Sequence, residues 1–582
     1  MMSGAQRDQG AAELRAVRAE SRGLMWAAAL FSVFVNILML TGPLYMLQIY
    51  DRVLGSRSES TLVAMTALMA FLFAMMGVLD YARGRVLARI GAGFQARLDR
   101  RVFSAVLRRE ASNPGGPGRS ANALRDLEAV QRLLSSPVFT AVFDIPWTPI
   151  FLAGIAIFHP WLGMLALGGG AVLILVTVLN QMLTAGPVRN ANLASMQADR
   201  WAEQVRTEAE MVRALGMSDA AFDRWHEARR RALDDTILSA DRAGQFSAIS
   251  KTLRMFLQSA MLGMGAYLVL HGELSAGAMI AGSILLGRAL APVDLAIGQW
   301  STVQRARQGW QGLVELLGEV PSDPPRTQLP RPAGHLRAEN LTVLPPGQSQ
   351  ASLRMVNFEL QPGEAMGVIG PSGAGKSTLA RCLTGVWKPA GGKIRLDGAS
   401  LDQFEPAVLG QHVGYLPQRV QLFDGTIAEN IAGLAKPDDA QVVSAAKKAA
   451  AHEMILELPE GYDTRVSGGG GMLSGGQMQR IGLARAMYGD PVVLVLDEPN
   501  SNLDNEGSRA LNLAVSEKKA SGGVVLIMAH RPSAITECEM LLVLDHGMVK
   551  AFGPRDEVLE QTVKNSRQIR SSSAEGKVGG VS

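Results

Sequence analysis

The sequence predicts a two-part fold, in which an α-helical membrane domain with six transmembrane helices is fused to an α/β domain that contains a phosphate-binding loop. Three observations support this prediction. Of the 582 residues, 47% are hydrophobic and only 19% are charged, whereas soluble domains carry about 25% charged residues. The long uncharged stretches lie before about residue 300. A glycine-rich loop that ends in lysine and serine, 370–377, follows in the second half of the chain.

The composition also argues against several classes of function. The formal net charge of +4 is too small to suggest a nucleic-acid partner. The two cysteines, Cys382 and Cys538, cannot build a disulfide framework. We expect both to be buried or reduced thiols in a cytosolic part of the chain.

Five apolar segments account for the six predicted spans. A membrane-spanning helix needs about 20 predominantly apolar residues. The first three segments contain no charged residue, and the last is interrupted by Arg288 and Asp294. The segments are 23–50, 62–79, 145–188 (two spans separated by a turn at 159–161), 246–270 and 274–297.

The basic residues predict how the spans are oriented. Segment 82–136 contains eleven arginines and segment 185–251 contains nine, whereas the three opposite loops together contain only Arg52 and Arg57. Because loops rich in Lys and Arg stay on the cytoplasmic side, we expect both long loops and both termini to be cytoplasmic, with the first span as an uncleaved anchor. The long loops are expected to continue their flanking spans as helices. Separate soluble domains are the weaker alternative, because neither loop shows an obvious core of its own.

Charged residues and prolines also occur in or beside the apolar segments. A charge within the membrane costs on the order of 2.5–3.5 kcal/mol on insertion scales, so we expect Asp144, Arg288 and Asp294 to face a cavity or to pair with one another. For Arg288 and Asp294, a place at the membrane–cytosol border is an equally good prediction. Pro146 and Pro149 free backbone carbonyl groups and predict a kink in the third span.

Five prolines within 320–332 indicate a semi-rigid linker between the two domains. This linker separates the apolar half of the chain from the half that carries the phosphate-binding loop. The predicted organisation is a cytoplasmic N-terminal segment 1–23, a transmembrane domain 24–318, a linker 319–336, a nucleotide-binding domain 337–566 and a flexible C-terminal tail 567–582.

The loop 370–377 has the spacing of a phosphate-binding loop and lies between a predicted strand, 365–369, and a predicted helix, 378–383. Its glycines let backbone N–H groups approach the β-phosphate of ATP, and the helix N-terminus attracts the phosphate charge. Lys376 is expected to reach the β- and γ-phosphates, and the Ser377 hydroxyl to bind Mg²⁺. A glycine-rich turn without a ligand is the minor alternative. The expected ATP-binding residues are Gly370, Pro371, Ser372, Gly373, Ala374, Gly375, Lys376, Ser377 and Thr378.

An apolar run at 492–496 is typical of a buried parallel strand and is followed by Asp497 and Glu498. At the C-terminal end of such a strand, a carboxylate pair lies beside the bound phosphates. Asp497 is expected to hold Mg²⁺ through water, and Glu498 to orient or deprotonate the attacking water. Downstream of a phosphate-binding loop, this pair indicates ATP hydrolysis.

The string 473–477, Leu-Ser-Gly-Gly-Gln, is the most discriminating motif of the chain. It resembles the signature of ATP-binding-cassette (ABC) proteins. The resemblance implies that the motif opens a helix whose N-terminus faces the γ-phosphate bound by the other subunit. The signature residues expected to contact that ATP are Ser474, Gly475, Gly476 and Gln477.

The same resemblance assigns roles to residues outside the signature. Gln418 matches the Q-loop glutamine, the segment 501–504 matches the D-loop with Asp504, and His530 matches the switch histidine that contacts the γ-phosphate. The catalytic residues implied in this way are Glu498, His530 and Gln418. The implied Mg²⁺ ligands are Ser377, Gln418 and Asp497.

Strings in both domains resemble type I secretion ATPases, and the subgroup they most resemble is the PrtD-like exporters of proteases and repeats-in-toxin proteins. The resemblance implies a protein of the bacterial inner membrane that uses ATP and Mg²⁺. It also implies a homodimer, because each ATP site needs a signature from a partner and one chain carries one phosphate loop and one signature. It also implies export of an unfolded polypeptide with a C-terminal signal, through a periplasmic adaptor of the membrane-fusion type and a TolC-like outer-membrane channel. The strings lie at 44–54, 143–150, 159–163, 423–427 and 497–504.

Two other functions stay open at this point. A lipid or small-molecule exporter would share the architecture and the ATPase motifs. A regulatory cassette protein that does not transport is the third hypothesis, and the six predicted spans argue against it. No cysteine or histidine occurs in residues 1–23, so we expect no processing peptidase ahead of the first span.

Overall fold

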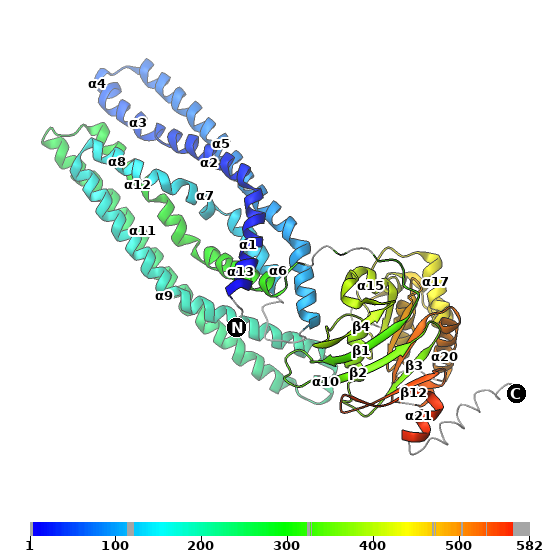
Figure 1. Ribbon diagram of the computed structural model, residues 1–582. Coiled ribbons are helices and arrows are strands. Elements are labelled where there is room, and N and C mark those ends of the chain that lie inside the picture. The colour runs from blue at the N-terminus through cyan, green and yellow to red at the C-terminus, as the bar shows by residue number, and fades with distance from the viewer. Residues whose placement is uncertain are drawn as a thin grey trace. The chain divides into compact units, whose positions relative to one another are not determined.

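The computed structural model of the chain describes residues 4–112, 122–322, 326, 329–467, 471, 473–501, 505–530 and 532–562. The chain divides into two compact units (Figure 1). The first consists of Met1–Arg108 and Pro117–Ser322, and the second of Arg109–Gly116 and Asp323–Ser582. The first unit is helical, and the second combines helices with β-sheets.

Within the described residues, six helices are long and apolar enough to span a membrane, which confirms the predicted number of spans. The turn predicted at 159–161 is also confirmed, because His159 is extended between α8 and α9 and its side chain accepts a hydrogen bond from the Trp161 N–H. The spanning segments are Arg22–Ser56 (α2 Arg22–Met39, α3 Thr41–Gln48, η1 Ile49–Val53 and α4 Leu54–Ser56), Glu59–Ser112 (α5), Pro137–Phe158 (α7, η3 and α8), Pro160–Thr207 (α9), Ser218–Leu270 (α11) and Ala276–Gly298 (α12).

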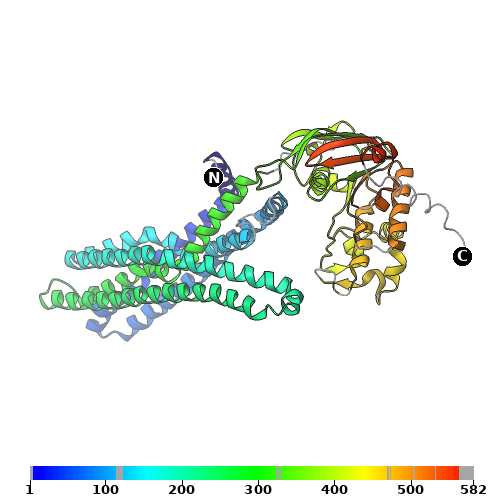
Figure 2. The ribbon, with the colours of Figure 1, turned by 90° about the horizontal axis from the view of Figure 1, so that it is seen from below.

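Three of these helices are much longer than a bilayer requires. Helices α5, α9 and α11 contain 54, 48 and 53 residues, or roughly 70–80 Å at about 1.5 Å per residue. Helices α9 and α11 lie side by side along their length (Figures 1 and 2). The prediction that the basic loops continue their flanking spans as helices is therefore confirmed.

The first basic loop has no core of its own, as expected, but it shares one with helices from outside the loop. Part of α5 packs with α1 (Gly4–Glu20), α6 (Ala123–Leu134) and α13 (Trp300–Glu319) around one hydrophobic cluster. Leu14, Leu127 and Leu313 lie in this cluster and are at most 1% exposed. Two of the contributing helices, α1 and α13, come from outside the loop, so the loop sequence alone showed no core.

The charged residues of the membrane segments do not pair with one another, contrary to one of the two expectations. Asp144 accepts hydrogen bonds from Asn36 Nδ2 at 2.8 Å and from buried Arg83 Nη1 at 2.7 Å. Asp294 pairs with Arg254 at 2.6 Å, and Arg288 is exposed. Arg83 lies on α5, just beyond the predicted span 62–79, whereas Arg254 lies on α11 within the predicted span 246–270.

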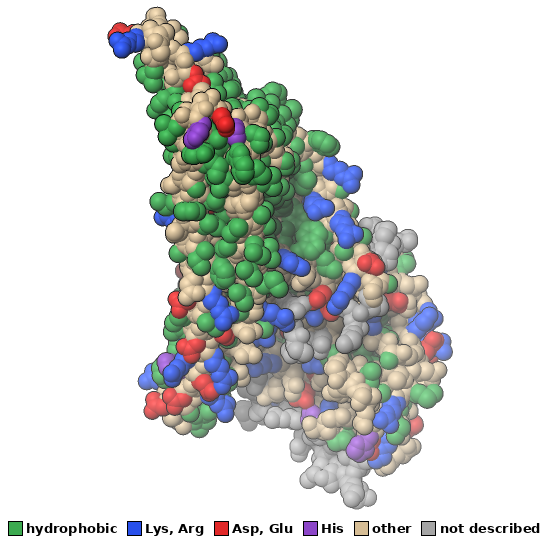
Figure 3. Space-filling model, turned by 90° about the vertical axis from the view of Figure 1, so that its left-hand side faces the viewer, with side chains coloured by type: hydrophobic (Ala, Val, Ile, Leu, Met, Phe, Trp, Pro, Cys, Tyr) green, Lys and Arg blue, Asp and Glu red, His purple; other side chains and the backbone are tan. Residues whose placement is uncertain are grey.

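The kink predicted in the third span is confirmed. Helix α7 (Pro137–Asp144) gives way to a 3₁₀ turn (Ile145–Trp147), and α8 (Thr148–Phe158) follows. Hydrophobic side chains cover much of the length of the helical unit on the face shown in Figure 3, whereas charged side chains gather toward its ends. This is the distribution that a bilayer-spanning bundle requires.

The second unit is built on a six-stranded sheet with strand order β12-β11-β3-β10-β9-β6, in which only β12 is antiparallel to its neighbour. The predicted strand 365–369 is confirmed as β3, and the predicted strand 492–496 is confirmed within one residue as β9. The strands are β3 (Ala365–Ile369), β6 (Val413–Leu416), β9 (Val493–Asp497), β10 (Val524–Ala529), β11 (Met540–Asp545) and β12 (Met548–Pro554).

Strands β9 and β10 are buried on both faces. In β9, Val493 and Val495 belong to one hydrophobic cluster, and Leu494 and Leu496 belong to the other. Such a strand has a continuous apolar run instead of an alternating pattern, which is why 492–496 could be recognised in the sequence.

A second, four-stranded sheet has the order β2-β1-β4-β5. Its strands are β1 (Leu336–Val343), β2 (Leu353–Leu360), β4 (Gly391–Leu396) and β5 (Ala399–Ser400). The helices of this unit are α14 (Lys376–Leu383), α15 (Pro406–His412), α16 (Ile427–Ile431), α17 (Asp439–Lys448), α18 (His452–Leu456), α19 (Gly475–Met487), α20 (Asn505–Ala520) and α21 (Arg555–Thr562).

Candidate functional site

The phosphate-binding loop connects β3 to α14. Gly375 has a φ of 101°, and a Cβ atom there would lie 2.6 Å from Leu353 Cδ2 and 2.8 Å from Ser352 O, so only glycine fits this position without a shift. Helix α14 begins at Lys376, two residues before the predicted start. The loop therefore presents a helix N-terminus, whose first N–H groups have no partner within the helix and can bind an anion.

The Lys376 side chain folds back over the loop. Its Nζ donates hydrogen bonds to Gly370 O at 2.8 Å and Pro371 O at 3.1 Å. Burial lowers the pKa of Lys376, and the nearby carboxylates of Glu498 and Asp497 act in the opposite direction. The ammonium group is thus positioned where a bound phosphate would supply the counter-charge.

Asp497 ends β9 and is 3% exposed. It accepts a hydrogen bond from Ser377 Oγ at 3.3 Å. Burial raises the pKa of Asp497, while the Ser377 hydrogen bond acts against that shift. A hydroxyl and a buried carboxylate that face each other form a donor set of hard oxygens, which suits Mg²⁺.

The three predicted catalytic side chains meet. Glu498 Oε2 accepts a hydrogen bond from Gln418 Nε2 at 2.9 Å, and Glu498 Oε1 lies 2.9 Å from His530 Nε2. These residues directly follow or closely follow β9, β6 and β10, which are neighbouring parallel strands. The C-terminal ends of such strands share one edge of the sheet, and ligands bind there in open α/β folds.

The backbone of Glu498 is strained. Its φ of 51° lies in the left-handed region, which is rare for a residue with a side chain and clusters at functional sites. The Glu498 N–H donates to Met528 O at 3.0 Å. This turn directs the carboxylate away from β9 and toward Gln418 and His530.

The signature residues cap α19 as predicted. Ser474 Oγ accepts from the Gln477 N–H at 3.3 Å, and Gln477 Oε1 accepts from the Ser474 N–H at 2.8 Å, which makes a reciprocal capping box. The structure thereby assigns the Gln477 side chain a local capping contact. The N–H groups of Gly475 and Gly476, in the first turn, are the groups best placed to meet an anion.

The D-loop prediction falls partly outside the described residues. Ser501 is described and exposed, whereas Asp504 lies outside the part of the chain that the structure describes. Its expected contact with ATP therefore stays a prediction.

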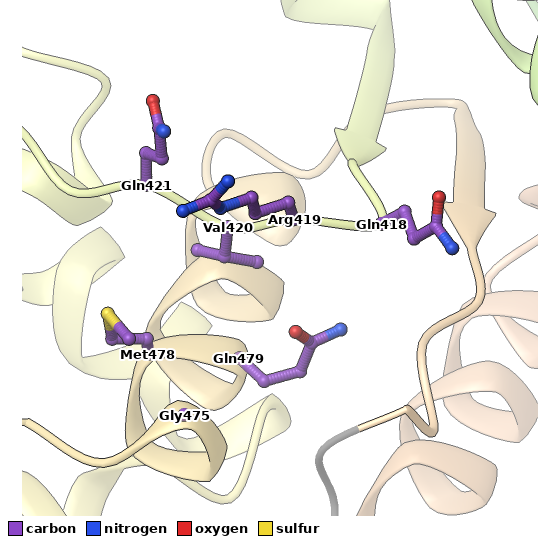
Figure 4. A pocket seen from close by; sticks show the side chains of 7 residues that line it. All are labelled: Gln418, Arg419, Val420, Gln421, Gly475, Met478 and Gln479. Atoms are coloured by element: carbon purple, nitrogen blue, oxygen red, sulfur yellow. The ribbon is translucent and has the colours of Figure 1, made fainter. Parts of the chain in front are cut away.

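A cavity of about 250 Å³ lies between the segment that follows β6 and the start of α19 (Figure 4). Among the wall residues that sequence reasoning missed is Gln479, which is 1% exposed and donates from Nε2 to Pro499 O at 3.2 Å. The only sequence signal was its position two residues after the signature. The lining residues are Gln418, Arg419, Val420, Gln421, Gly475, Met478 and Gln479.

Comparisons with known families agree with this geometry. Residues 353–501 match the family model of the ABC transporter, and residues 25–291 match that of the ABC transporter transmembrane region. In structure, the chain resembles a bacterial Atm1-family ABC exporter with ATP bound, with a TM-score of 0.79 and 24% identity over 95% of this chain and 99% of that one. This likeness confirms the predicted fold class.

Two curated relatives are similar in sequence over most of the chain. The type I secretion system ATP-binding protein PrsD of Rhizobium meliloti (strain 1021) is 44% identical over 95% of this chain and 94% of its own length. The leukotoxin translocation ATP-binding protein LktB of Mannheimia glucosida is 29% identical over 93% of this chain and 77% of its own. The chain therefore belongs to the ABC transporters of type I secretion, with membrane and ATPase domains on one polypeptide.

Proposed function

We propose that this chain exports an unfolded polypeptide across the bacterial inner membrane, using ATP hydrolysis, as the ABC component of a type I secretion system. The observation that carries the proposal is the 44% identity to PrsD along nearly the whole of both chains. That identity extends over the membrane unit as well as the ATPase unit, because it covers 95% of this chain. The ATPase chemistry alone would fit a lipid exporter equally well.

At the catalytic centre, Glu498 acts as the general base for the water that attacks the γ-phosphate. His530 and Gln418 each lie 2.9 Å from one of its carboxylate oxygens and keep the base oriented. Lys376 and the N-terminus of α14 bind the phosphates. Ser377, Asp497 and Gln418 would hold Mg²⁺, which would supply charge to neutralise the phosphates.

The site is completed by a second copy of the chain. The chain contains one phosphate loop, 370–377, and one signature, 473–477. In the proposed homodimer, the N-terminus of α19 in one subunit faces the γ-phosphate held by the other, and Asp504 contributes from the D-loop. Both cassettes and both termini are cytoplasmic in this assembly, as the basic segments predict.

The proposed partners follow from export across two membranes. They are a periplasmic membrane-fusion adaptor, a TolC-like outer-membrane channel and a cargo with an uncleaved C-terminal signal. The cargo passes between the two subunits, because an unpaired backbone amide in hydrocarbon costs several kcal/mol and needs a wet path. Arg288 on α12 is exposed in the single chain and is the candidate to border this path.

Deleting the gene and comparing culture supernatants tests the proposal. We expect at least one secreted polypeptide to disappear and to return when the intact chain, but not the Glu498→Gln variant, is supplied. An unchanged set of secreted proteins, together with lipid-stimulated ATPase activity in vesicles, would overturn polypeptide export and favour a lipid exporter.

A disulfide trap locates the path. Arg288→Cys is combined with a cargo that carries a cysteine and is stalled by a fused, tightly folded domain. Crosslinks are expected only when the cargo retains its C-terminal segment. Equal crosslinking without that segment would contradict a C-terminal signal.

A further inference from the structure

Two glutamines from different walls of the cavity in Figure 4 bond to the same dipeptide. Gln418 Nε2 lies 2.9 Å from Glu498 Oε2, and Gln479 Nε2 lies 3.2 Å from Pro499 O. Their side chains extend toward the same side of the cavity (Figure 4). Gln418 thus holds the carboxylate of Glu498, and Gln479 holds the backbone that immediately follows it.

The backbone at Glu498 and Pro499 needs hydrogen-bond partners that hold it in place. Glu498 has a φ of 51°, and a non-glycine residue stays in this region only where its surroundings over-determine it. On the N-terminal side, the Glu498 N–H bonds to Met528 O at 3.0 Å. On the C-terminal side, Pro499 has no N–H group to donate, and two carbonyls serve as anchors. Glu498 O accepts from the Ser501 N–H at 3.2 Å, and Pro499 O accepts from the Gln479 side chain.

The geometry of Gln479 suits this anchoring role. The residue is 1% exposed and lies in the second turn of α19, so its carboxamide has little rotational freedom. A buried carbonyl that loses its donor pays the full desolvation penalty. Loss of the Gln479 amide would therefore favour movement of Pro499, and the strained Glu498 would move with it.

We propose that Gln479 is a positioning residue for Glu498 and links the signature helix to the general base of the same cassette. The proposal rests on the assignment of Glu498 as the base. The signature lies at the N-terminus of helix α19. Its Ser474 precedes Gln479 by five residues. A shift of α19 when the signature engages the partner's ATP is thereby passed to the base through one side-chain hydrogen bond.

The test uses Gln479→Leu, which keeps most of the volume and removes the donor, in the purified full-length dimer in lipid nanodiscs. We expect kcat for ATP hydrolysis to fall about 10- to 100-fold, since a displacement of about 1 Å at a catalytic group costs up to about 10². The KM for ATP should change by less than about twofold, because the phosphate loop is untouched. Met478→Leu, on the same helix and in the same cavity wall, is the matched control and should keep the parent rate.

A double-mutant cycle separates positioning from a general structural effect. In the Glu498→Gln background, single-turnover hydrolysis should be no slower when Gln479→Leu is added, because the residue acts only through the base. An equal fold-loss in both backgrounds, or a kcat within twofold of the parent in the single variant, would overturn the proposal. If Gln479→Leu does not fold, Gln479→Met, which is unbranched and also lacks the donor, takes its place.

The outcomes also separate this proposal from the one on which it rests. Near-normal hydrolysis by Glu498→Gln alone would remove the assigned base, whatever Gln479 does. Loss of hydrolysis in Glu498→Gln without an effect of Gln479→Leu would remove only the positioning role.

Discussion

Replacing Glu498 by glutamine tests the hydrolytic site most directly. Each carboxylate oxygen has one polar neighbour at 2.9 Å, His530 Nε2 on one side and Gln418 Nε2 on the other. Glutamine keeps the shape but turns an NH₂ group toward one of these nitrogens, so one contact is lost. No group is then left at this position to accept a proton from water.

The expected loss follows from the role of a general base. Proton transfer by a positioned side chain contributes about 10²–10⁴ in rate, which corresponds to about 2.7–5.4 kcal/mol at about 1.36 kcal/mol per tenfold. Phosphate release at saturating ATP should fall by that factor. Binding of ATP should be kept, because Lys376 and the α14 N-terminus are unchanged, and the two cassettes should stay closed on ATP.

The assay is phosphate release by the purified chain in nanodiscs, with a fluorescent ATP analogue to measure binding. Glu457→Gln, at an exposed position of the same unit, is the control and should behave as the parent. Hydrolysis by Glu498→Gln within tenfold of the parent rate would refute the assignment, because no other described carboxylate contacts both Gln418 and His530.

Three further predictions concern the dimer, the membrane unit and the thiols. In a purified heterodimer of Lys376→Ala and Ser474→Arg subunits, one composite site carries both lesions and the other carries neither, so ATP titration should show two unlike sites; two identical sites would exclude a signature that acts in trans. Arg83→Met should lower the free energy of unfolding by about 3–5 kcal/mol, the usual cost of removing one partner of a buried ion pair. Replacing Asp144 by leucine as well should restore much of the lost stability. Fluorescence-detected size exclusion after heating compares the thermal stability of the variants. Burial raises the pKa of both native thiols to about 12, so a maleimide should label neither at pH 8 in the folded chain and both in denaturant, whereas rapid native labelling would contradict their burial.

The chemistry of the ATPase site was readable in the sequence because its motifs are local. A phosphate loop needs glycines and a lysine at fixed spacing, and Gly375 is needed because a Cβ would meet Leu353 and Ser352 O. A strand buried on both faces leaves a continuous apolar run, so β9 and its terminal acids could be placed within one residue. The six spans follow in the same way from length and the lack of charge.

The tertiary structure decided which residues from distant parts of the chain meet. Asp144 could have paired with Arg288 by sequence alone, but packing of α2, α5 and α7 brings it to Arg83. The first basic loop gains its core only where α1 and α13 join it. These contacts depend on helix rotation and register, which no local pattern encodes.

At the catalytic centre, Gln479 is a residue whose contact only the tertiary structure reveals. Sequence reading ended the signature at Gln477, because the motif is defined by its fit to a phosphate. Only the approach of α19 to the end of β9 brings a buried glutamine to the Pro499 carbonyl. The sequence thus determined which groups can bind and cleave ATP. The packing of distant segments determined which groups hold Glu498 in its strained backbone conformation, because the free energy that maintains this strain comes from non-local contacts.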